Sequence, residues 1–394
     1  MVSGASELEQ VEELRELVKS LLTPYYDTHF NLLRWIQGHP NLSIKEVSKK
    51  LTHHLLFRKC MWDMDTYHKK KRGFHPIHKH WTRGITGKSG VLENVIVNIE
   101  QAGKVDYEGM LAKYSINDVM KARLFDLEEF LSEVMKLEKE TGKQASILYV
   151  MDAEGVEYTK KLVDLILISL RSISEFMADH YVELVKYFVI VNIPPWAYAV
   201  WMMMKPLLPE RSRQKIKTIV ISRSFNSIIL FHVRMLSASN WRREILDLAS
   251  PEACPSFWND ENNNGFGATI DRPFKVPRIE VEMPDKLDKM HLKAGSVHWI
   301  DYDLKQGDTL KWWMMSSGNF GFSILIGDGN EENDVYLTPQ LYPLFPWMPG
   351  PTDAPFEDTI VIPEDGHYKL WISNARAWWS TLTLNYRISV IPRK

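Results

Sequence analysis

The sequence has few cysteines and little net charge, and both shortages limit what the protein can do. Cys60 and Cys254 are the only cysteines in 394 residues, and their separation supports neither a disulfide framework nor a cysteine-based metal site. The formal net charge of -2 does not favour nucleic acid as a partner. The first residues, MVSGASELEQVEELRELV, are acidic and amphipathic, so we expect no secretory signal and a reducing, cytoplasmic location.

Recognisable catalytic motifs are also lacking. No glycine-rich turn or nucleophile elbow follows any expected strand in the middle of the chain. Asp152, Glu154 and Glu183 are candidate acids, but no nucleophile and base stand at an interpretable spacing around them. Three histidines between residues 75 and 80 lack nearby cysteine or carboxylate ligands, which disfavours a metal site. The sequence therefore predicts a protein that is not an enzyme and that needs no metal or cofactor.

One long segment lacks formal charge altogether. It is Tyr187–Met204, YFVIVNIPPWAYAVWMMM, and its two consecutive prolines argue against a single membrane-spanning helix. Phe188–Val191 has the composition of a strand buried on both faces. Trp196–Leu207 is predicted to be a helix that is apolar on most sides. Such a helix is either a core element or a mobile lid that closes a lipid-sized cavity and dips into a bilayer.

The hydrophobic pattern divides the chain into regions. Helical periods over residues 8–59 precede alternating strands and helices, which predict an α/β domain with a largely parallel sheet. After a segment rich in Asn, Gly and Pro, only strand patterns follow, which predicts a β-sandwich. The α/β strands are expected at Val95–Ile99, Ile147–Met151, Phe188–Val191 and Thr218–Ser222. The predicted domains are a helical region at 7–65, the α/β domain at 66–258, a linker at 259–277 and the sandwich at 278–392.

Two further segments suggest contacts with partners. Thr66–Leu92 carries lysines and arginines but no acid, so it is either a solvated surface loop or a surface attracted to anionic lipid headgroups. Tyr342–Pro351, YPLFPWMPGP, is too long for a tight turn, so it is either a binding loop or a loop folded over its own sandwich. The residues predicted to contact a membrane are Lys69, Lys70, Lys71 and Arg72.

Several stretches resemble a known family. FNLLRWIQGHPNLSIKEVSKKLTHHLLFRK, the MDAEGV that follows a strand, and VIVNIPPWAYAVWMMMKPLLPERSRQKIKTI resemble the CRAL-TRIO lipid-binding domain. DYDLKQGDTLKWWMMSSGNFGFSILI and VIPEDGHYKLWISNARAWWSTLTLNYRISV resemble a GOLD domain, an arrangement similar to that of supernatant protein factor and its relatives. The resemblance implies a soluble carrier that takes one lipid into a closed pocket beneath a gate helix and exchanges it at membranes.

The resemblance also implies which residues meet the lipid. Glu183 and Lys215 match positions that hold the headgroup in phosphatidylinositol-transferring members, and a lysine suits a phosphate as a carboxylate suits inositol hydroxyls. Small hydroxyl residues that serve phosphatidylcholine in some members are Ile147 and Tyr149 here, and an arginine-rich turn is replaced by Gln37–His39. A neutral isoprenoid, tocopherol-like or sterol-like lipid therefore stays open. The predicted lipid-binding residues are Ile147, Tyr149, Glu183, Phe188, Ile190, Trp196, Val200, Trp201, Met204 and Lys215.

Two functions follow from these patterns. The leading prediction is non-enzymatic binding and intermembrane transfer of a hydrophobic lipid, either phosphatidylinositol or a neutral isoprenoid or tocopherol-like lipid, by a cytoplasmic protein that visits a membrane surface transiently. The alternative is a membrane-trafficking adaptor in which the GOLD domain recruits a Golgi or endosomal protein partner through the segment Tyr342–Pro351.

Overall fold

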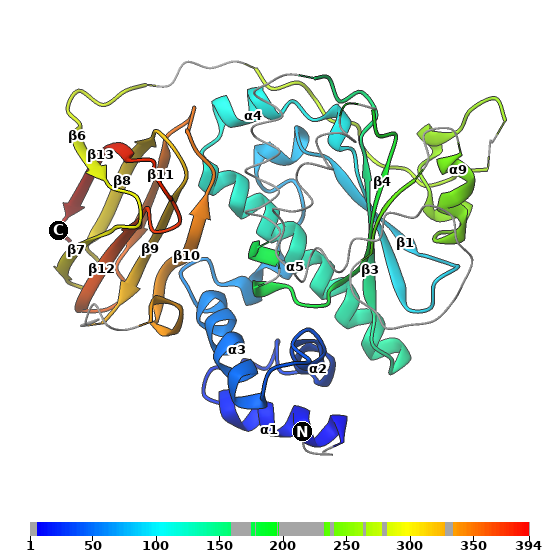
Figure 1. Cartoon of the computed structure of the whole chain (residues 1–394), viewed down its shortest axis with the longest axis horizontal. Coiled ribbons are helices and arrows are strands. Elements are labelled where there is room, and N and C mark those ends of the chain that lie inside the picture. Colours follow the sequence, from blue (N-terminus) through cyan, green and yellow to red (C-terminus); the bar gives the residue numbers. More distant parts are fainter. Residues whose placement is uncertain are drawn as a thin grey trace. The chain divides into compact units, whose positions relative to one another are not determined.

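The chain forms two compact units, each built from segments that are distant in the sequence (Figure 1). The computed structural model describes residues 6–158, 175–177, 179–194, 196, 232–236, 240–262, 265–277, 282–327 and 334–393. The first unit comprises Met1–Lys70, Glu108–Leu124 and Pro277–Lys394, and the second comprises Lys71–Tyr107 and Phe125–Val276. The long helix α5 (Ile116–Thr141) begins in the first unit and continues in the second.

The first unit opens with the three helices that the sequence predicts. They are α1 (Glu7–Val18), α2 (His29–Gln37) and α3 (Ile44–Arg58). Each begins at a hydroxyl side chain that accepts a hydrogen bond from a backbone N–H of the first turn, which is otherwise without an intrahelical partner. The predicted capping box of Ser43 and Glu46 is present at the start of α3. The buried side chains between these helices are Val11, Leu14, Leu32, Leu33, Leu51 and Leu55.

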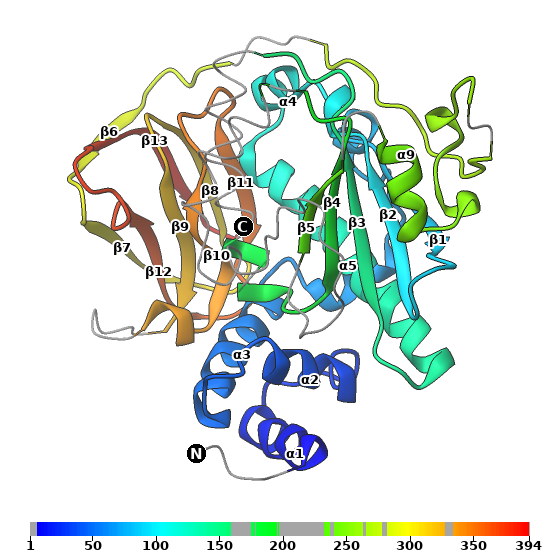
Figure 2. The same ribbon diagram turned by 45° about the vertical axis from the view of Figure 1, so that its right-hand side comes forward.

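An all-β sandwich forms the C-terminal part of the first unit, as the sequence predicts (Figure 2). Its antiparallel sheets have the strand orders β10-β9-β12-β7 and β11-β8-β13-β6. Between them the ring of Trp312 lies 4.9 Å from that of Tyr342, and Phe322 lies 4.7 Å from Phe356. The strands are β6 (Asp288–Leu292), β7 (Val297–Leu304), β8 (Thr309–Ser316), β9 (Phe320–Ile326), β10 (Gln340–Met348), β11 (Phe356–Val361), β12 (Gly366–Ser373) and β13 (Leu382–Ile391).

The prediction of a loop at Tyr342–Pro351 is wrong over most of that segment. Residues Gln340–Met348 form β10, which pairs with β9 and buries Tyr342, Leu344 and Phe345. Its prolines are tolerated because β10 is an edge strand with repeated shifts of register, so several backbone positions need no partner in the ladder. The aromatic residues of this segment therefore serve the core of the sandwich.

The N-terminal helices and the sandwich pack together within the first unit. The backbone N–H of Met61 donates to the carbonyl oxygen of Leu341 at 2.9 Å. The ring of Trp62 lies 5.3 Å from that of Tyr342. At the start of α5, Lys121 forms an ion pair with Asp358 of β11 at 2.7 Å. The edge strands β10 and β11 of the sandwich therefore contact segments that lie far before them in the sequence.

A mixed, mostly parallel sheet is the centre of the second unit. Its strand order is β1-β2-β3-β4-β5, with β1 antiparallel to β2 and the other neighbours parallel. The predicted strands at Val95–Ile99, Ile147–Met151 and Phe188–Val191 are confirmed, while Thr218–Ser222 lies outside the described residues. The sequence did not indicate β1 or β5. The bounds are β1 (Arg83–Lys88), β2 (Val95–Glu100), β3 (Ser146–Asp152), β4 (Val185–Val191) and β5 (His232–Met235).

Different helices pack on the two faces of this sheet. Leu148, Val150, Val189 and Val191 pack with Trp241 of the short helix α9 (Trp241–Glu244) on one face. The opposite side of the sheet faces α5, and Figure 1 shows the sheet between α5 and α9. The prediction that β4 is buried on both faces is wrong, because alternate residues of this strand are only half-buried.

Candidate functional site

An aromatic row crosses the face of the sheet that meets α5. Tyr149 of β3 is opposite Phe188 of β4 in the register, and their rings stack at 5.0 Å with an interplanar angle of 10°. On its other side Tyr149 meets the edge of Phe130 of α5 at 5.9 Å. Tyr149 is fully buried, whereas Phe188 and Ile190 are half-buried. This face is thus fully covered at Ile147 and Tyr149 of β3 and only partly covered at Met151 and over β4.

Two predicted site residues lie at opposite ends of β4. Glu183 precedes the strand in a left-handed backbone conformation with φ of 54°, and Trp196 follows the strand. The half-buried ring of Trp196 meets that of Tyr158 edge-on at 5.4 Å. A strand advances about 3.3 Å per residue, so the seven residues of β4 separate these ends by roughly 20 Å. Along the chain, Phe188 and Ile190 therefore lie between the carboxylate of Glu183 and the indole of Trp196.

The structure brings some of the predicted lipid-binding residues together and leaves the others undescribed. Ile147, Tyr149, Phe188 and Ile190 share the face of the sheet toward α5, since they alternate along β3 and β4 with the residues that pack beneath α9. Glu183 and Trp196 bound this row. The remaining predictions lie outside the described residues, as do positions 197–207 of the predicted gate helix; these residues are Val200, Trp201, Met204 and Lys215.

Asp152, the acid at the end of β3, is used to join three segments. Its Oδ1 accepts from the backbone N–H of Glu154 and from the Asn192 amide, both at 2.9 Å. Its Oδ2 accepts from the indole N–H of Trp258 at 2.7 Å. A carboxylate whose two oxygens both accept such bonds holds the ends of β3 and β4 in place, so the geometry assigns Asp152 to structure.

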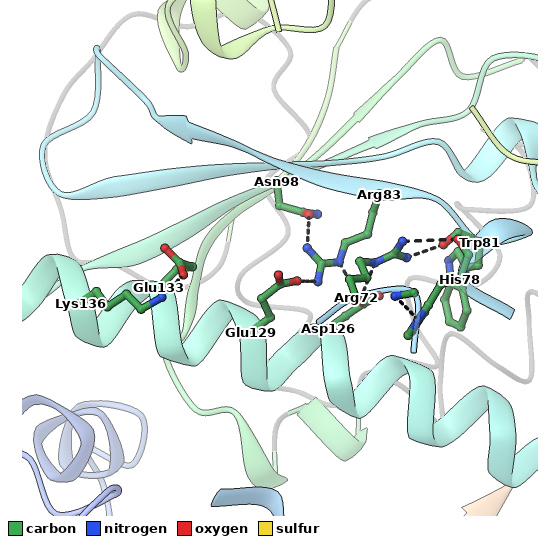
Figure 3. A network of polar contacts seen from close by, with 10 residues as sticks. Arg72, His78, Trp81, Arg83, Asn98, Asp126, Glu129, Glu133 and Lys136 are labelled. Atoms are coloured by element: carbon green, nitrogen blue, oxygen red, sulfur yellow. Dashed lines mark hydrogen bonds and ion pairs between the residues drawn. The ribbon is translucent and has the colours of Figure 1, made fainter. Parts of the chain in front are cut away.

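The sequence patterns did not reveal a buried charge network between β1 and α5 (Figure 3). Arg83 of β1 and Asp126 of α5 are almost completely buried, and their Nε and Oδ1 atoms lie 2.8 Å apart. Arg72 reaches the same oxygen at 3.1 Å, and Arg83 also pairs with Glu129. Burial opposes the charge of Arg83, but the two carboxylates outweigh it and raise its pKa.

This network also supports the aromatic row. The guanidinium carbon of Arg83 lies 4.6 Å from the ring centre of Phe130, the residue that meets Tyr149. A guanidinium over an aromatic face is attracted by the ring quadrupole, more strongly when it is desolvated. The sequence contained one signal for the network, because acidic residues, Asp126 and Glu129 among them, interrupt the apolar positions around Phe125, Leu127 and Phe130.

The four residues predicted to contact a membrane differ from one another. Lys69, Lys70 and Lys71 are exposed, so their role at a membrane stays a prediction. Arg72 is half-buried, and besides the Asp126 pair it donates to the carbonyl oxygen of Trp81. These contacts direct its guanidinium into the protein. The sequence cannot distinguish the two cases, because all four residues stand in one basic run.

Two histidines of the histidine-rich segment contact backbone groups of the protein itself. His78 accepts from the backbone N–H of Gly73 at 2.9 Å, and His80 lies 2.9 Å from the carbonyl oxygen of Phe274. Among the described residues no group of three or more histidine, cysteine or carboxylate side chains is arranged to hold a metal ion. The same part of the chain contains no helix that is both long enough and apolar enough to cross a membrane.

Comparisons with known families match three parts of the chain. Residues 93–228 match the family described as the CRAL/TRIO domain, and an all-β domain follows this region in the chain. Residues 275–393 match an F28H7_8_C-like C-terminal domain, and residues 4–67 match a domain of unknown function, DUF8435. The C-terminal match is not described as a GOLD domain, so that part of the resemblance stays a prediction.

Two curated relatives extend over nearly the whole chain. CRAL-TRIO domain-containing protein F28H7.8 of Caenorhabditis elegans is 24% identical, and the match covers 98% of this chain and 90% of the relative. Protein ctg-1 of the same organism is 22% identical, with 98% of both chains covered. Among solved structures, Sfh5 is 14% identical, with a TM-score of 0.48, over 71% of this chain and 95% of that one.

Proposed function

We propose that this protein binds a hydrophobic lipid and transfers it between membranes without catalysing a reaction. The observation that carries the proposal is the apolar face of β3 and β4, where buried Tyr149 gives way to half-buried Phe188 and Ile190. A CRAL/TRIO domain suggests a lipophilic ligand, and this face offers it an apolar surface. Each CH₂ group of an acyl or isoprenoid chain buried there contributes about 0.8 kcal/mol, so chain burial dominates the affinity.

The ends of β4 suggest how such a lipid is oriented. Glu183 offers a carboxylate at one end, while Trp196 marks the apolar end that leads into the predicted gate helix. A carboxylate accepts hydrogen bonds from hydroxyl groups, so both an inositol ring and the single hydroxyl of a tocopherol-like lipid suit it. Only phosphatidylinositol would also need the predicted lysine, Lys215, to meet its phosphate. The substitution Lys215→Ala therefore distinguishes the two lipid classes.

Lipid loading and lipid transfer test the proposal directly. We expect native mass spectrometry of the purified protein to show one bound lipid, and we expect the protein to move a fluorescent lipid from donor to acceptor vesicles. A protein that neither carries nor accepts a lipid in these assays would contradict the proposal. If Lys215→Ala lowers loading with phosphatidylinositol but not with a neutral lipid, a phospholipid ligand is supported. If the protein loads a neutral lipid and Lys215→Ala loads it as well as the wild type does, a neutral, tocopherol-like ligand is supported.

The adaptor alternative has lost the feature that suggested it. That alternative rested on an aromatic binding loop at Tyr342–Pro351, whereas residues up to Met348 form a strand of the sandwich. Deleting the segment would remove an edge strand along with its buried aromatic residues. We therefore keep lipid binding as the proposed function.

A further inference from the structure

Two neighbouring tryptophans lie almost completely exposed at one end of the sandwich. Trp378 and Trp379 are each 89% exposed, in the connection between β12 and β13. Tryptophan is highly buried on average, because its large ring gains more than most side chains from leaving water. Two adjacent rings in solvent therefore indicate a surface that meets a partner. We call residues 374–381, which contain both rings, the tryptophan loop.

The base of the tryptophan loop is held rigidly. Asn374 is buried, and its side-chain amide donates to the carbonyl oxygens of Leu292 at 3.0 Å and of Ser380 at 2.9 Å. Its backbone N–H donates to the carbonyl oxygen of Ser296 at 2.9 Å, and its own carbonyl accepts from Gly295. These bonds join the loop to the turn between β6 and β7. The loop therefore presents its rings from a fixed base, which lowers the entropy cost of inserting them into a partner.

The tryptophan loop and the turn to which it is bonded carry only positive charges. The tryptophan loop contains Arg376, and the adjoining residues 293–296 contain Lys293, but neither segment has an aspartate or glutamate. The whole chain has a formal net charge of -2, so these two connections are more basic than the chain as a whole, although the neighbouring connection between β10 and β11 contributes the exposed Asp353. Lysine and arginine close to a membrane are attracted to anionic headgroups, while tryptophan rings favour the interface between headgroups and acyl chains.

We propose that the tryptophan loop inserts Trp378 and Trp379 into the interface of an anionic membrane. The rings stand on a short connection between strands and are almost fully exposed, while β6 and β7 beside it combine apolar with polar residues. A protein partner of standard size needs roughly 800 Å² of complementary surface on each side, whereas a fluid lipid layer adapts to a protruding pair of rings. This site holds the protein on a membrane, and it goes beyond the proposed binding of a lipid in the α/β domain.

Vesicle co-sedimentation of the full-length protein tests the site. We compare the wild type with Trp378→Ser/Trp379→Ser on phosphatidylcholine vesicles with and without phosphatidylserine. The affinity for the anionic vesicles is expected to fall at least about tenfold in the double variant. A matched control, Val361→Ser/Ile391→Ser, removes side chains that are 65% and 54% exposed at the other end of the paired strands, and its binding is expected to equal that of the wild type.

Two further measurements separate the possible outcomes. Lys293→Glu should weaken binding to the anionic vesicles and leave binding to pure phosphatidylcholine unchanged. Tryptophan emission of the wild type minus that of the double variant should shift to shorter wavelength when anionic vesicles are added. Equal vesicle binding by wild type and double variant overturns the proposal. A double variant that still binds vesicles but no longer binds a protein partner would likewise overturn it. Lipid loading measured by native mass spectrometry stays normal in the double variant, so the two proposals fail independently.

Discussion

Single buried charges decide much of the stability of the second unit. Asp126 forms ion pairs with both Arg72 and Arg83 in a region from which water is largely excluded. Removing one member of a buried ionic group leaves the others without compensation, which costs far more than losing an exposed pair. The charge of Asp126 is therefore needed for stability as long as the two arginines are present, even though apolar residues could replace the network as a whole.

The substitution Asp126→Asn tests this role. It keeps the shape of the side chain but removes its charge, so we expect the free energy of unfolding to fall by about 3 to 5 kcal/mol. Urea denaturation followed by circular dichroism measures the change. The exposed pair of Glu133 and Lys136 on the same helix supplies the control, because Lys136→Ala should cost no more than about 0.5 kcal/mol. Equal losses of unfolding free energy in the two variants would show that the buried charge of Asp126 is not needed to compensate the arginines.

Two buried histidines make stability depend on pH. Desolvation lowers the pKa of His53 and of His78 to about 4, so both stay neutral in the folded protein well below their ordinary titration range. In the unfolded chain they take up protons near pH 6.5. Between pH 6.5 and about 4 the unfolded state therefore binds more protons, and stability decreases as the pH falls through this window.

This dependence has a measurable size. At pH 5 each histidine should lower the free energy of unfolding by about 2 kcal/mol relative to pH 7.5. We expect His53→Gln to reduce the difference between the two pH values by that amount, since glutamine can keep the bond to the carbonyl oxygen of Tyr336 without titrating. The exposed His298→Gln serves as the control and should leave the difference unchanged. A pH profile of His53→Gln identical to the wild type would contradict the assignment.

At the scale of elements, β4 separates structure from ligand binding by its two faces. Tyr187 packs toward the cluster beneath α9, whereas Phe188 faces the aromatic row toward α5. Both are half-buried aromatic residues on one strand. Serine at either position removes a similar amount of apolar surface, so the pair distinguishes loss of stability from loss of a ligand site.

We expect Phe188→Ser to reduce lipid loading and transfer at least about tenfold, while Tyr187→Ser keeps both near the wild-type level. The physical reason is that only Phe188 contributes to the face assigned to the lipid. Native mass spectrometry and vesicle transfer measure the two effects, and thermal unfolding confirms that both variants are folded. Equal loss of loading in the two variants would place the ligand elsewhere.

The predicted gate helix gives a second test at this scale. The substitution Trp201→Asp places a charge on an element that the sequence predicts to be apolar on most sides, and a charge is costly to move into a lipid interface. We expect slower lipid exchange with an unchanged thermal unfolding temperature. Stopped-flow transfer between vesicles measures the rate. An exchange rate equal to that of the wild type would remove the gating role from this helix.

Elements with continuous apolar runs could be predicted from the sequence, and others could not. VIVNI, ILYVM and FVIV indicate β2, β3 and β4 because short β-branched runs favour strands. The edge strand β10 was missed because its prolines are typical of loops, and β1 because glycines and lysines weaken its pattern. The half-buried side of β4 depends on neighbouring elements, so no pattern within FVIV could indicate it.

At the scale of the whole molecule, the sequence does not reveal how the first unit is assembled. Local patterns predict the N-terminal helices and the C-terminal sandwich separately. Their association depends on contacts between residues separated by nearly 300 positions, such as His53 Nδ1 and the carbonyl oxygen of Tyr336 at 3.1 Å. No periodicity records such a pairing. The linker predicted at 259–277 ends where the second unit gives way to the first, at Val276 and Pro277, and the first unit also contains the distant segment Met1–Lys70.

Truncation at this linker tests the shared unit. A chain that ends at Val276 loses the partners of Trp62, whose ring otherwise meets Tyr342 and Phe345, and the partner of Lys121 on β11. Burying a tryptophan side chain contributes several kcal/mol, so its exposure should destabilise the helices that hold it. We expect hydrogen exchange followed by mass spectrometry to show faster exchange in α3 of the truncated chain than in the full chain, while β2 and β3 keep their protection. Unchanged protection of α3 would mean that the N-terminal helices are stable without the sandwich, and their contacts with β10 would then add little to folding.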